Sequence, residues 1–401
     1  MGAPAILSLA LAACLAAAAA GEDALKLVIE VCRHGDRSPV ELFPGDTYSE
    51  DSWYQGYGQL SPRGMRAHYA LGQRLRAKYV PGFLSANYSR HELRVASTDV
   101  DRTIQSAMSQ MAGLYPPGTG PVLEGSEDDP VPGLPERWMA LPIHTIPKAD
   151  DNLLRAYDKG KCPRYDAILS ARMKGAEVAA YAAQHKELWE TLTALTGHPV
   201  DIYNVYQVAD SWVCEQAHGR PLIEGATPEI VGAVYDAAAF TLKQMFKADG
   251  GEGARPHEVA RLTGGNLIRE LLESMSGRLA PRTSEEAGYR FKLYSAHDTT
   301  LVALLNALGA WDNVNPPYNS TVTFELHGPE GSVEEAEHHV HVAYNGRVAN
   351  VLGASPAPPP LQKLRAALEA VTVESYKEWA KECGLHDVRK TLSPQIPRKK
   401  P

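Results

Sequence analysis

Apolar residues recur at strand-like spacing in three widely separated stretches of the chain. A nearly continuous apolar run at 25–33 predicts a buried strand, and runs at 92–97 and 289–296 have the same character. Each run is followed by apolar residues at helical spacing, which predicts helices at 62–78, after Thr98 and at 298–309. Ser61-Pro62 has the sequence of an N-cap and first helical residue, and Thr98 and Asp101 have capping-box spacing.

The middle of the chain has a different pattern. Proline and glycine are frequent at 115–147, which predicts a long connection. From 148 to 254 only helical patterns and irregular loops follow, which indicates an inserted helical domain. The expected helices are 164–183, 184–196, 203–217 and 227–247.

The last third returns to mixed structure. Leu262-Thr-Gly-Gly265 is expected to open a helix at 265–276, and 321–327 and 338–344 alternate like antiparallel strands. Helices are expected at 361–371 and 373–382. The whole pattern predicts an α/β fold with a mainly parallel central sheet flanked by helices, built from 21–147 and 255–390 and interrupted by the helical domain 148–254.

The first 20 residues carry no charge, are rich in Ala and Leu, and end in three alanines. They have the pattern of a signal peptide, 1–20, which predicts a protein that is secreted or resides in the lysosomal lumen. No second apolar stretch approaches the length of a membrane helix, so we expect no membrane anchor. The basic end, 391–401, is expected to be a flexible tail.

Charge and cysteine content restrict the possible partners and disulfides of the protein. The net charge of −8 comes without a basic stripe, which argues against a nucleic-acid partner. One of the five cysteines, Cys14, lies in the signal peptide; the remaining four allow three ways of pairing all of them. Asn87 and Asn319 begin acceptor triplets for N-glycosylation, which a secretory route would make available.

Charged residues gather just after the predicted strands. Arg-His-Gly-Asp-Arg-Ser-Pro at 33–39 follows the first strand, Arg102 follows the second, and His297-Asp298 follows the third. Because ligands bind at the carboxyl ends of strands in such sheets, these segments should converge on one pocket. Three arginines suit a phosphate dianion, with His34 as nucleophile and Asp298 as the proton donor to the leaving group.

Simpler interpretations exist for each of these residues. Arg102 could be a surface residue paired with Asp99 or Asp101, and Asp298 could cap its helix and still donate a proton. The histidines at 338, 339 and 341 suggest a metal site, but no other ligands of suitable spacing accompany them, so a solvated strand face is expected. Cys32 lacks the loop of a cysteine phosphatase and is expected to be a buried thiol.

With these residues assembled, the chain resembles the histidine acid phosphatases, in the branch of the prostatic, lysosomal and testicular enzymes. The resemblance covers most of the chain after the signal peptide. The stretches that carry it are 33–39, 56–60 with 64–65, 97–103, 142–147, 162–165, 264–265, 294–300 and 316–318.

The resemblance implies a core like that of phosphoglycerate mutases with a helical cap, and a reaction through a phosphohistidine on His34 with Asp298 as general acid. It implies that small phosphomonoesters, with phosphopeptides as further candidates, are the substrates, that no metal or other cofactor is needed, and that a homodimer forms. The implied phosphate ligands are Arg33, Arg37, Arg102 and His297.

The resemblance also implies one disulfide, Cys162–Cys383, because the partners of the family's other bridges are replaced here. Cys32 and Cys214 would then be free. The rival hypotheses are a phytase-like or lysophosphatidate-type enzyme, and a secreted binding protein on an inactive phosphatase scaffold. The phytases compared have His-Asp-Thr-Asn where this chain has Thr300 at the last position.

Overall fold

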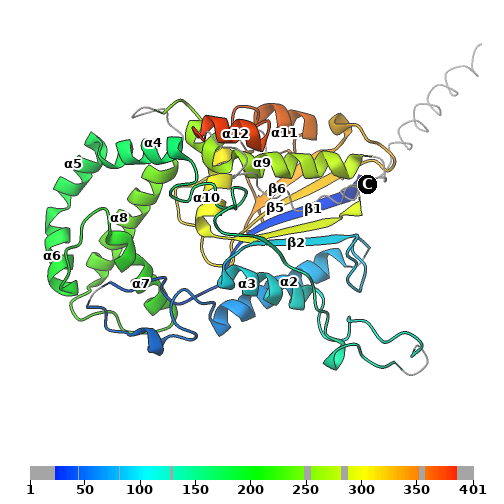
Figure 1. Cartoon of the computed structure of the whole chain (residues 1–401), viewed down its shortest axis with the longest axis horizontal. Helices are drawn as coiled ribbons and strands as arrows, with labels where there is room; N and C mark the ends of the chain where they lie inside the picture. The colour runs from blue at the N-terminus through cyan, green and yellow to red at the C-terminus, as the bar shows by residue number, and fades with distance from the viewer. Residues whose placement is uncertain are drawn as a thin grey trace, which may run out of the picture.

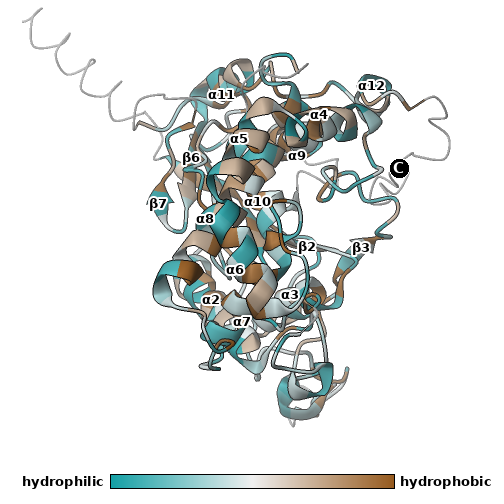
Figure 2. Cartoon of the chain, turned by 90° about the vertical axis from the view of Figure 1, so that its left-hand side faces the viewer, coloured by the Kyte–Doolittle hydropathy of each residue, from teal (hydrophilic) through white to brown (hydrophobic). Residues whose placement is uncertain are grey.

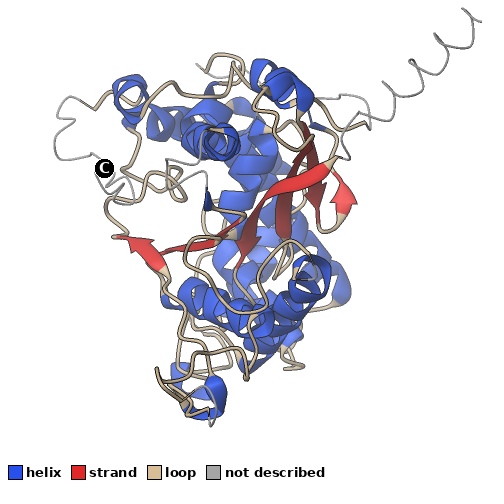
Figure 3. Ribbon diagram, turned by 90° about the vertical axis from the view of Figure 1, so that its right-hand side faces the viewer, coloured by secondary structure: helices blue, strands red, loops and turns tan. Residues whose placement is uncertain are grey.

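The computed structural model describes residues 23–43, 45–80, 82–126, 130–247, 254–280, 288–351 and 357–385. Within them, one seven-stranded sheet runs through the centre in the order β3-β2-β4-β1-β5-β6-β7, with helices on both of its faces (Figures 1 and 3). The signal-peptide and tail predictions lie outside the described residues. The strands are β1 Ala24–Arg33, β2 Leu93–Thr98, β3 His144–Ile146, β4 Phe291–Ala296, β5 Thr321–Gly328, β6 His339–Tyr344 and β7 Arg347–Val348.

The sheet is mixed, which corrects the prediction of a mainly parallel one. β1 pairs in parallel with β4, β4 with β2 and β2 with β3, whereas β5, β6 and β7 are added in antiparallel pairings. A parallel neighbour requires a crossover, usually a helix, and the short link from β5 to β6 holds only the 3₁₀ turn Glu335–Glu337. The two antiparallel strands predicted near 321 and 338 are confirmed.

The alternation of side chains along β1 divides the core between the two faces. Leu27, Ile29 and Val31 pack in the cluster that holds α9, α10 and α11. Val28 and Cys32 point the other way, into the cluster with α2 and α3. The helices are α2 Pro62–Tyr79, α3 Asp101–Leu114, α4 Pro163–Met173, α5 Ala176–Gln184, α6 Lys186–Thr196, α7 Val205–Ala217, α8 Pro228–Phe246, α9 Glu258–Leu279, α10 Asp298–Ala307, α11 Leu361–Ala367 and α12 Tyr376–Glu382.

Several helix boundaries differ from the predictions. The helix expected at 164–183 is two helices, α4 and α5, separated at Gly175. α9 begins well before residue 265, and its paired glycines lie inside it: a Cβ on Gly264 would come within 2.7 Å of the carbonyl oxygen of Ala303 in α10. Close helix packing, rather than a helix start, explains these glycines.

The two predicted N-caps have opposite outcomes. Ser61 caps α2, its side chain accepting from the amide of Gly64. The predicted capping box at Thr98 is wrong, because Thr98 ends β2 and Val100 takes the N-cap position of α3 without a side-chain bond.

Helices α4 to α8 lie to one side of the sheet (Figure 1). α5 to α8 share an apolar cluster that includes Trp189, Leu192, Val208 and Trp212. Seen from that side, apolar and polar residues mix along the helices, the pattern of amphipathic elements that pack on one another (Figure 2). In the described part of the chain, no helix has both the length and the apolar character needed to cross a membrane.

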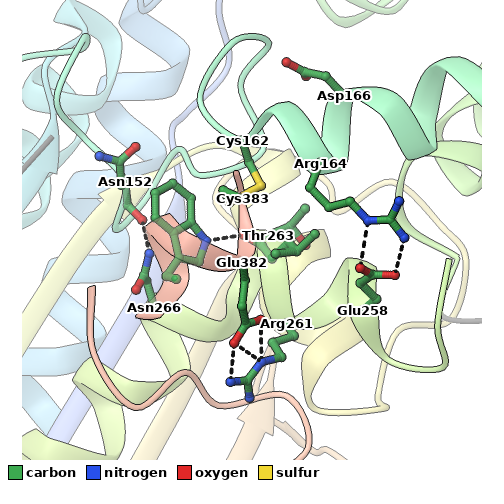
Figure 4. Close-up of a disulfide and its surroundings, with 12 residues drawn as sticks. Asn152, Cys162, Arg164, Asp166, Glu258, Arg261, Thr263, Asn266, Glu382 and Cys383 are labelled. Atoms are coloured by element: carbon green, nitrogen blue, oxygen red, sulfur yellow. Dashed lines mark hydrogen bonds and ion pairs between the residues drawn. A yellow bond between two sulfur atoms is a disulfide. The ribbon is translucent and has the colours of Figure 1, made fainter. Parts of the chain in front are cut away.

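A disulfide between Cys162 and Cys383 ties the start of α4 to the end of α12 (Figure 4). Both sulfur-bearing residues are buried. Near them Glu382 binds Arg261 of α9 with two carboxylate oxygens, and Glu258 binds Arg164 of α4. Cys32 and Cys214 are free and buried, so the expectation of one bridge and two free thiols matches the structure.

Removing this disulfide should lower the free energy of unfolding. The bridge closes a loop of 221 residues, which the chain-entropy model values at up to about 5 kcal/mol. The Arg261–Glu382 ion pair keeps α12 docked in the folded variant, so the loss should come from the greater freedom of the unfolded chain. Urea unfolding of Cys383→Ser tests this. Reductant should destabilise the wild-type protein and leave the variant unchanged; a variant as stable as the wild type would contradict the prediction.

Candidate active site

The backbone after β1 is fixed on both sides by neighbouring strands. The amide of His34 donates to the carbonyl oxygen of Ala296 at the end of β4, and the carbonyl oxygen of His34 accepts from Asn319. Gly35 lies against the first turn of α2, where a Cβ would come within 2.7 Å of the Cα of Gly64. Only glycine allows this approach, which holds the His34 side chain at the carboxyl end of the sheet.

The ring of His34 has a defined tautomer. Its Nδ1 lies 2.9 Å from the carbonyl oxygen of Gly35, which can only accept, so Nδ1 carries the proton and Nε2 keeps its lone pair. Burial first, and then the charges of Arg102, Arg33 and Arg37, lower the pKa of His34 well below its usual value. A neutral imidazole with a free Nε2 is therefore present even in acid.

Arg33 is paired with the carboxyl group that begins α10. Its Nη2 lies 2.9 Å from Oδ2 of Asp298, its Nη1 donates to the carbonyl oxygen of Pro316, and its guanidinium lies 4.3 Å from the ring centre of Tyr318. Burial raises the pKa of Asp298, but Arg33, Arg37 and the amide of Thr299 lower it overall. These contacts favour the ionised form of Asp298 at neutral pH when no anion is bound.

Arg37 is held by a carboxylate from the helical region. Asp210 of α7 accepts from Nη2 of Arg37 at 2.7 Å and from Nη1 at 3.1 Å, and also from the amide of Val40. Both side chains of the pair are buried. Burial opposes the charge on Arg37, yet Asp210 raises its pKa well above the usual value. α7 thereby fixes the second arginine of the 33–39 segment.

Arg102, in the first turn of α3, is the cation of this cluster whose charge is least compensated. Its guanidinium lies 3.4 Å from the carbonyl oxygen of Gly58 and 3.4 Å from Nδ1 of His297, and among the described residues no carboxylate is within ion-pair distance of it. Burial and the charge of Arg37 lower the pKa of Arg102 to about 10. A buried guanidinium in this situation favours binding of an anion.

His297, at the N-cap of α10, completes the cluster. Thr98 Oγ1 lies 3.0 Å from its Nε2, and Nη1 of Arg155 lies 2.7 Å from the same atom. Its ring centre is 5.6 Å from that of His34. Burial, then Arg102 and Arg155, lower the pKa of His297 well below the usual value, so this imidazole is neutral as well.

The six residues singled out from the sequence thus lie in one buried, cationic cluster: Arg33, His34, Arg37, Arg102, His297 and Asp298. The arrangement offers a nucleophilic nitrogen, guanidinium donors for several oxygens of one anion, and a carboxyl group paired with Arg33. Sequence reasoning did not assign a role to Asp210, Arg155 or Tyr318. Tyr318 lay in a matching motif, whereas Asp210 and Arg155 had no distinguishing pattern around them.

Other predictions concern residues outside the cluster. His341 is exposed on β6, as expected for a solvated strand face, but His338 is buried and bonded to the carbonyl oxygen of Glu334. Asn87 is exposed, which suits a glycosylation acceptor. Asn319 is half-buried and donates its backbone amide to the carbonyl oxygen of His34, and glycosylation there stays a prediction.

Loss of the Asp210 carboxylate should destabilise the fold. Asp210→Ala would leave Arg37 buried without its counter-charge, which typically costs about 3 to 5 kcal/mol. Asp210→Asn keeps the shape and one acceptor oxygen and should cost less. Urea unfolding at neutral pH measures both variants, and equal stability of Asp210→Ala and the wild type would show that Arg37 finds another partner.

Comparisons with known proteins agree with this geometry. The pattern described as histidine phosphatase superfamily (branch 2) matches residues 24–345. The chain is similar to prostatic acid phosphatase of Bos taurus, with 33% identity over 92% of this chain and 89% of the relative. It is also similar to lysosomal acid phosphatase of Rattus norvegicus, with 35% identity over 90% of this chain and 80% of the relative.

Among solved structures, the fold is similar to that of Hafnia alvei phytase in complex with tartrate, with a TM-score of 0.64 and 14% identity over 90% of this chain and 98% of that one. The phytase from Citrobacter braakii has a TM-score of 0.62 and 17% identity over 90% of this chain and 99% of that one. At these identities the likeness concerns the fold.

Proposed function

Because the chain belongs to branch 2 of the histidine phosphatase superfamily and is an acid phosphatase like the relatives it matches over most of its length, we propose that it hydrolyses phosphate monoesters through a phosphohistidine on His34. One observation carries the assignment of His34. Its Nδ1–H is fixed by the carbonyl oxygen of Gly35, which leaves Nε2 as an unprotonated nucleophile among three arginines.

In the first step, Nε2 of His34 attacks phosphorus in line with the ester oxygen, a nitrogen–phosphorus bond forms and the ester phosphorus–oxygen bond breaks. Asp298 gives its proton to the departing alkoxide. In the second step, Asp298 takes a proton from water, which attacks the phosphohistidine and releases phosphate and His34. Arg33, Arg37, Arg102 and His297 bind the non-bridging oxygens and stabilise the charge that shifts in each transition state.

Asp298 requires acid to start the cycle. Its pKa is lowered by Arg33 and Arg37 in the free protein, so the protonated form is scarce at neutral pH. A bound phosphate dianion shares these arginines and raises the pKa of Asp298 again. Acidic solution increases the fraction of Asp298 that is protonated, which fits an acid phosphatase.

We further propose that helices α4 to α8 form a cap on the catalytic core, with 148–254 as the cap and 21–147 and 255–390 as the core. Two contacts support this: Asp210 of α7 holds Arg37, and Arg155, just before α4, contacts His297. The helical region therefore supplies groups to the same pocket as the sheet.

A lumenal or secreted location is proposed on two grounds. Relatives of the chain are lysosomal acid phosphatases, and the Cys162–Cys383 disulfide is typical of an oxidising compartment. Glycosylation at Asn87 and assembly as a homodimer remain predictions from the sequence.

The test of the function is hydrolysis of p-nitrophenyl phosphate in acid, followed by a panel of phytate, AMP, phosphotyrosine, a phosphopeptide and lysophosphatidate. We expect activity on small monoesters. Preference for phytate would support the phytase-like alternative, and preference for lysophosphatidate the lipid-phosphate alternative. Complete absence of turnover would indicate a binding protein instead.

A further inference from the structure

The buried hydroxyl of Thr300 is a point where two segments beside the proposed site meet. Thr300 is in the first turn of α10, the helix that begins with Asp298. Its Oγ1 lies 2.9 Å from the carbonyl oxygen of Leu154, 2.8 Å from the hydroxyl of Tyr157 and 3.3 Å from the amide nitrogen of His297. Leu154 and Tyr157 belong to the connection from β3 to α4, so this one hydroxyl joins that connection to the start of α10.

The three contacts fix the direction of each hydrogen bond. The carbonyl oxygen of Leu154 can only accept, so it takes the single proton of the Thr300 hydroxyl. The amide of His297 can only donate and occupies one lone pair of Oγ1, and the other lone pair then accepts from Tyr157. Burial raises the pKa of Tyr157, so its phenol keeps the proton that it donates, and its oxygen can accept from the nearby side chain of Thr299.

These bonds hold the backbone from which the site residues of α10 project. The amide of His297 is tied to a side chain of the first turn, and Asp298 is the next residue. The connection on the other side of the hydroxyl is itself fixed, because Oδ1 of Asp151 accepts from the amide of Leu154 at 2.9 Å. Loss of the Thr300 hydroxyl would therefore detach the first turn of α10 from the segment that supports it.

We propose that Thr300 and Tyr157 are positioning residues that hold the first turn of α10, and with it the carboxyl group of Asp298, where that group can protonate the leaving group. The inference rests on the proposed function in taking Asp298 as the general acid. Neither residue needs to touch the substrate, because both are buried and their hydroxyls are engaged with each other.

Two other roles predict different behaviour. As a purely structural contact, the two hydroxyls would influence stability without changing the kinetics of the folded protein. As a proton donor to the leaving group, Tyr157 would matter more than Thr300. Positioning predicts the reverse order, because removing the Thr300 hydroxyl deletes all three hydrogen bonds, whereas removing that of Tyr157 deletes one of them.

The variants for the test are Thr300→Val, which keeps the shape but not the hydroxyl, Thr300→Ser, which keeps the hydroxyl, and Tyr157→Phe. The matched controls are Thr263→Val in α9, where a buried hydroxyl donates to the carbonyl oxygen of Val259, and Tyr165→Phe, a buried tyrosine of α4. Thermal unfolding verifies that each variant is folded, and Tyr157→Phe keeps the test valid if Thr300→Val does not fold.

The first measurement is amide hydrogen exchange at the start of α10. It requires no turnover, so it tests the hydrogen bonds even if the proposed phosphatase activity fails. The amide of His297 should exchange about tenfold faster in Thr300→Val than in the wild type, and Thr300→Ser should restore its protection. Unchanged protection of His297 in Thr300→Val overturns the proposal.

The second measurement compares an alkyl phosphate with p-nitrophenyl phosphate at acid pH. In Thr300→Val, kcat for the alkyl phosphate should fall about 100-fold and that for p-nitrophenyl phosphate much less, because a misplaced Asp298 matters most for a leaving group that needs a proton. Tyr157→Phe should show the same selectivity with a loss of about fivefold, and Thr300→Ser should recover most of the activity. Both controls should stay within about twofold of the wild type.

Asp298→Asn, measured beside these variants, separates the two levels of the argument. If Asp298→Asn slows the alkyl phosphate selectively but Thr300→Val slows both substrates equally or neither, the positioning role is wrong and the proposed reaction stands. If Asp298→Asn slows both substrates equally, the general acid is wrongly assigned and the positioning role falls with it. A loss in Tyr157→Phe larger than that in Thr300→Val would also contradict the proposal, since it would make Tyr157 the proton donor.

Discussion

His34→Ala is expected to abolish turnover, lowering kcat about ten-thousand-fold or more while the protein stays folded. The substitution removes the Nε2 nucleophile and leaves the arginine pocket intact, so inorganic phosphate should still bind. The amide of His34 keeps its bond to Ala296, which preserves the end of β1. The measurement is steady-state hydrolysis of p-nitrophenyl phosphate together with the thermal unfolding midpoint.

Trapping the intermediate separates a nucleophile from a merely structural histidine. Wild-type protein mixed with radiolabelled substrate and quenched in alkali should carry acid-labile phosphate on the peptide that contains His34, and His34→Ala should carry none. His91→Ala, at an exposed histidine, is the matched control and should behave as the wild type. Label on another residue, or more than a few per cent activity in His34→Ala, would refute the assignment.

Asp298→Asn should produce a loss that depends on the leaving group. Alkyl phosphates need a proton on the departing oxygen, so their kcat should fall by a factor of about 100 to 10,000. p-Nitrophenyl phosphate has a leaving group that scarcely needs protonation and should be slowed much less. Comparison of the two substrates at acid pH is the measurement, and equal slowing of both would mean that Asp298 positions the phosphate or α10 instead.

The pH profile gives an independent check on Asp298. The wild type should have an optimum at about pH 4.5 to 6, and the acid-dependent rise in activity should vanish in the variant. Stability should change with pH in the opposite direction to activity. The pKa of Asp298 is lowered in the folded protein, because its carboxylate pairs with Arg33. This pair therefore stabilises the fold above about pH 4, and its contribution is lost as the pH falls. The difference in unfolding free energy between wild type and Asp298→Asn should therefore shrink in acid.

Local sequence was sufficient wherever a proposed site residue lies within a few positions of a strand end. β1 and β4 are predicted from their apolar runs. Because the two strands are parallel neighbours, the residues that follow them, His34 and His297, lie at the same edge of the sheet. The helix starting at Pro62 was likewise predictable, because its N-cap bond joins residues only three apart. Contacts between residues a few positions apart can be predicted without knowing the rest of the fold.

Tertiary packing decided what surrounds these residues. Asp210 is 173 positions from Arg37, and Arg155 is 142 positions from His297, so no local pattern relates the members of either pair. Thr98 shows the same effect: its spacing suited a helix cap, but its hydroxyl instead contacts Thr103 and His297. The groups at the strand ends follow from the local sequence. Asp210 and Arg155 reach Arg37 and His297 only because the helical region packs against the sheet, which brings together residues that are far apart in the chain.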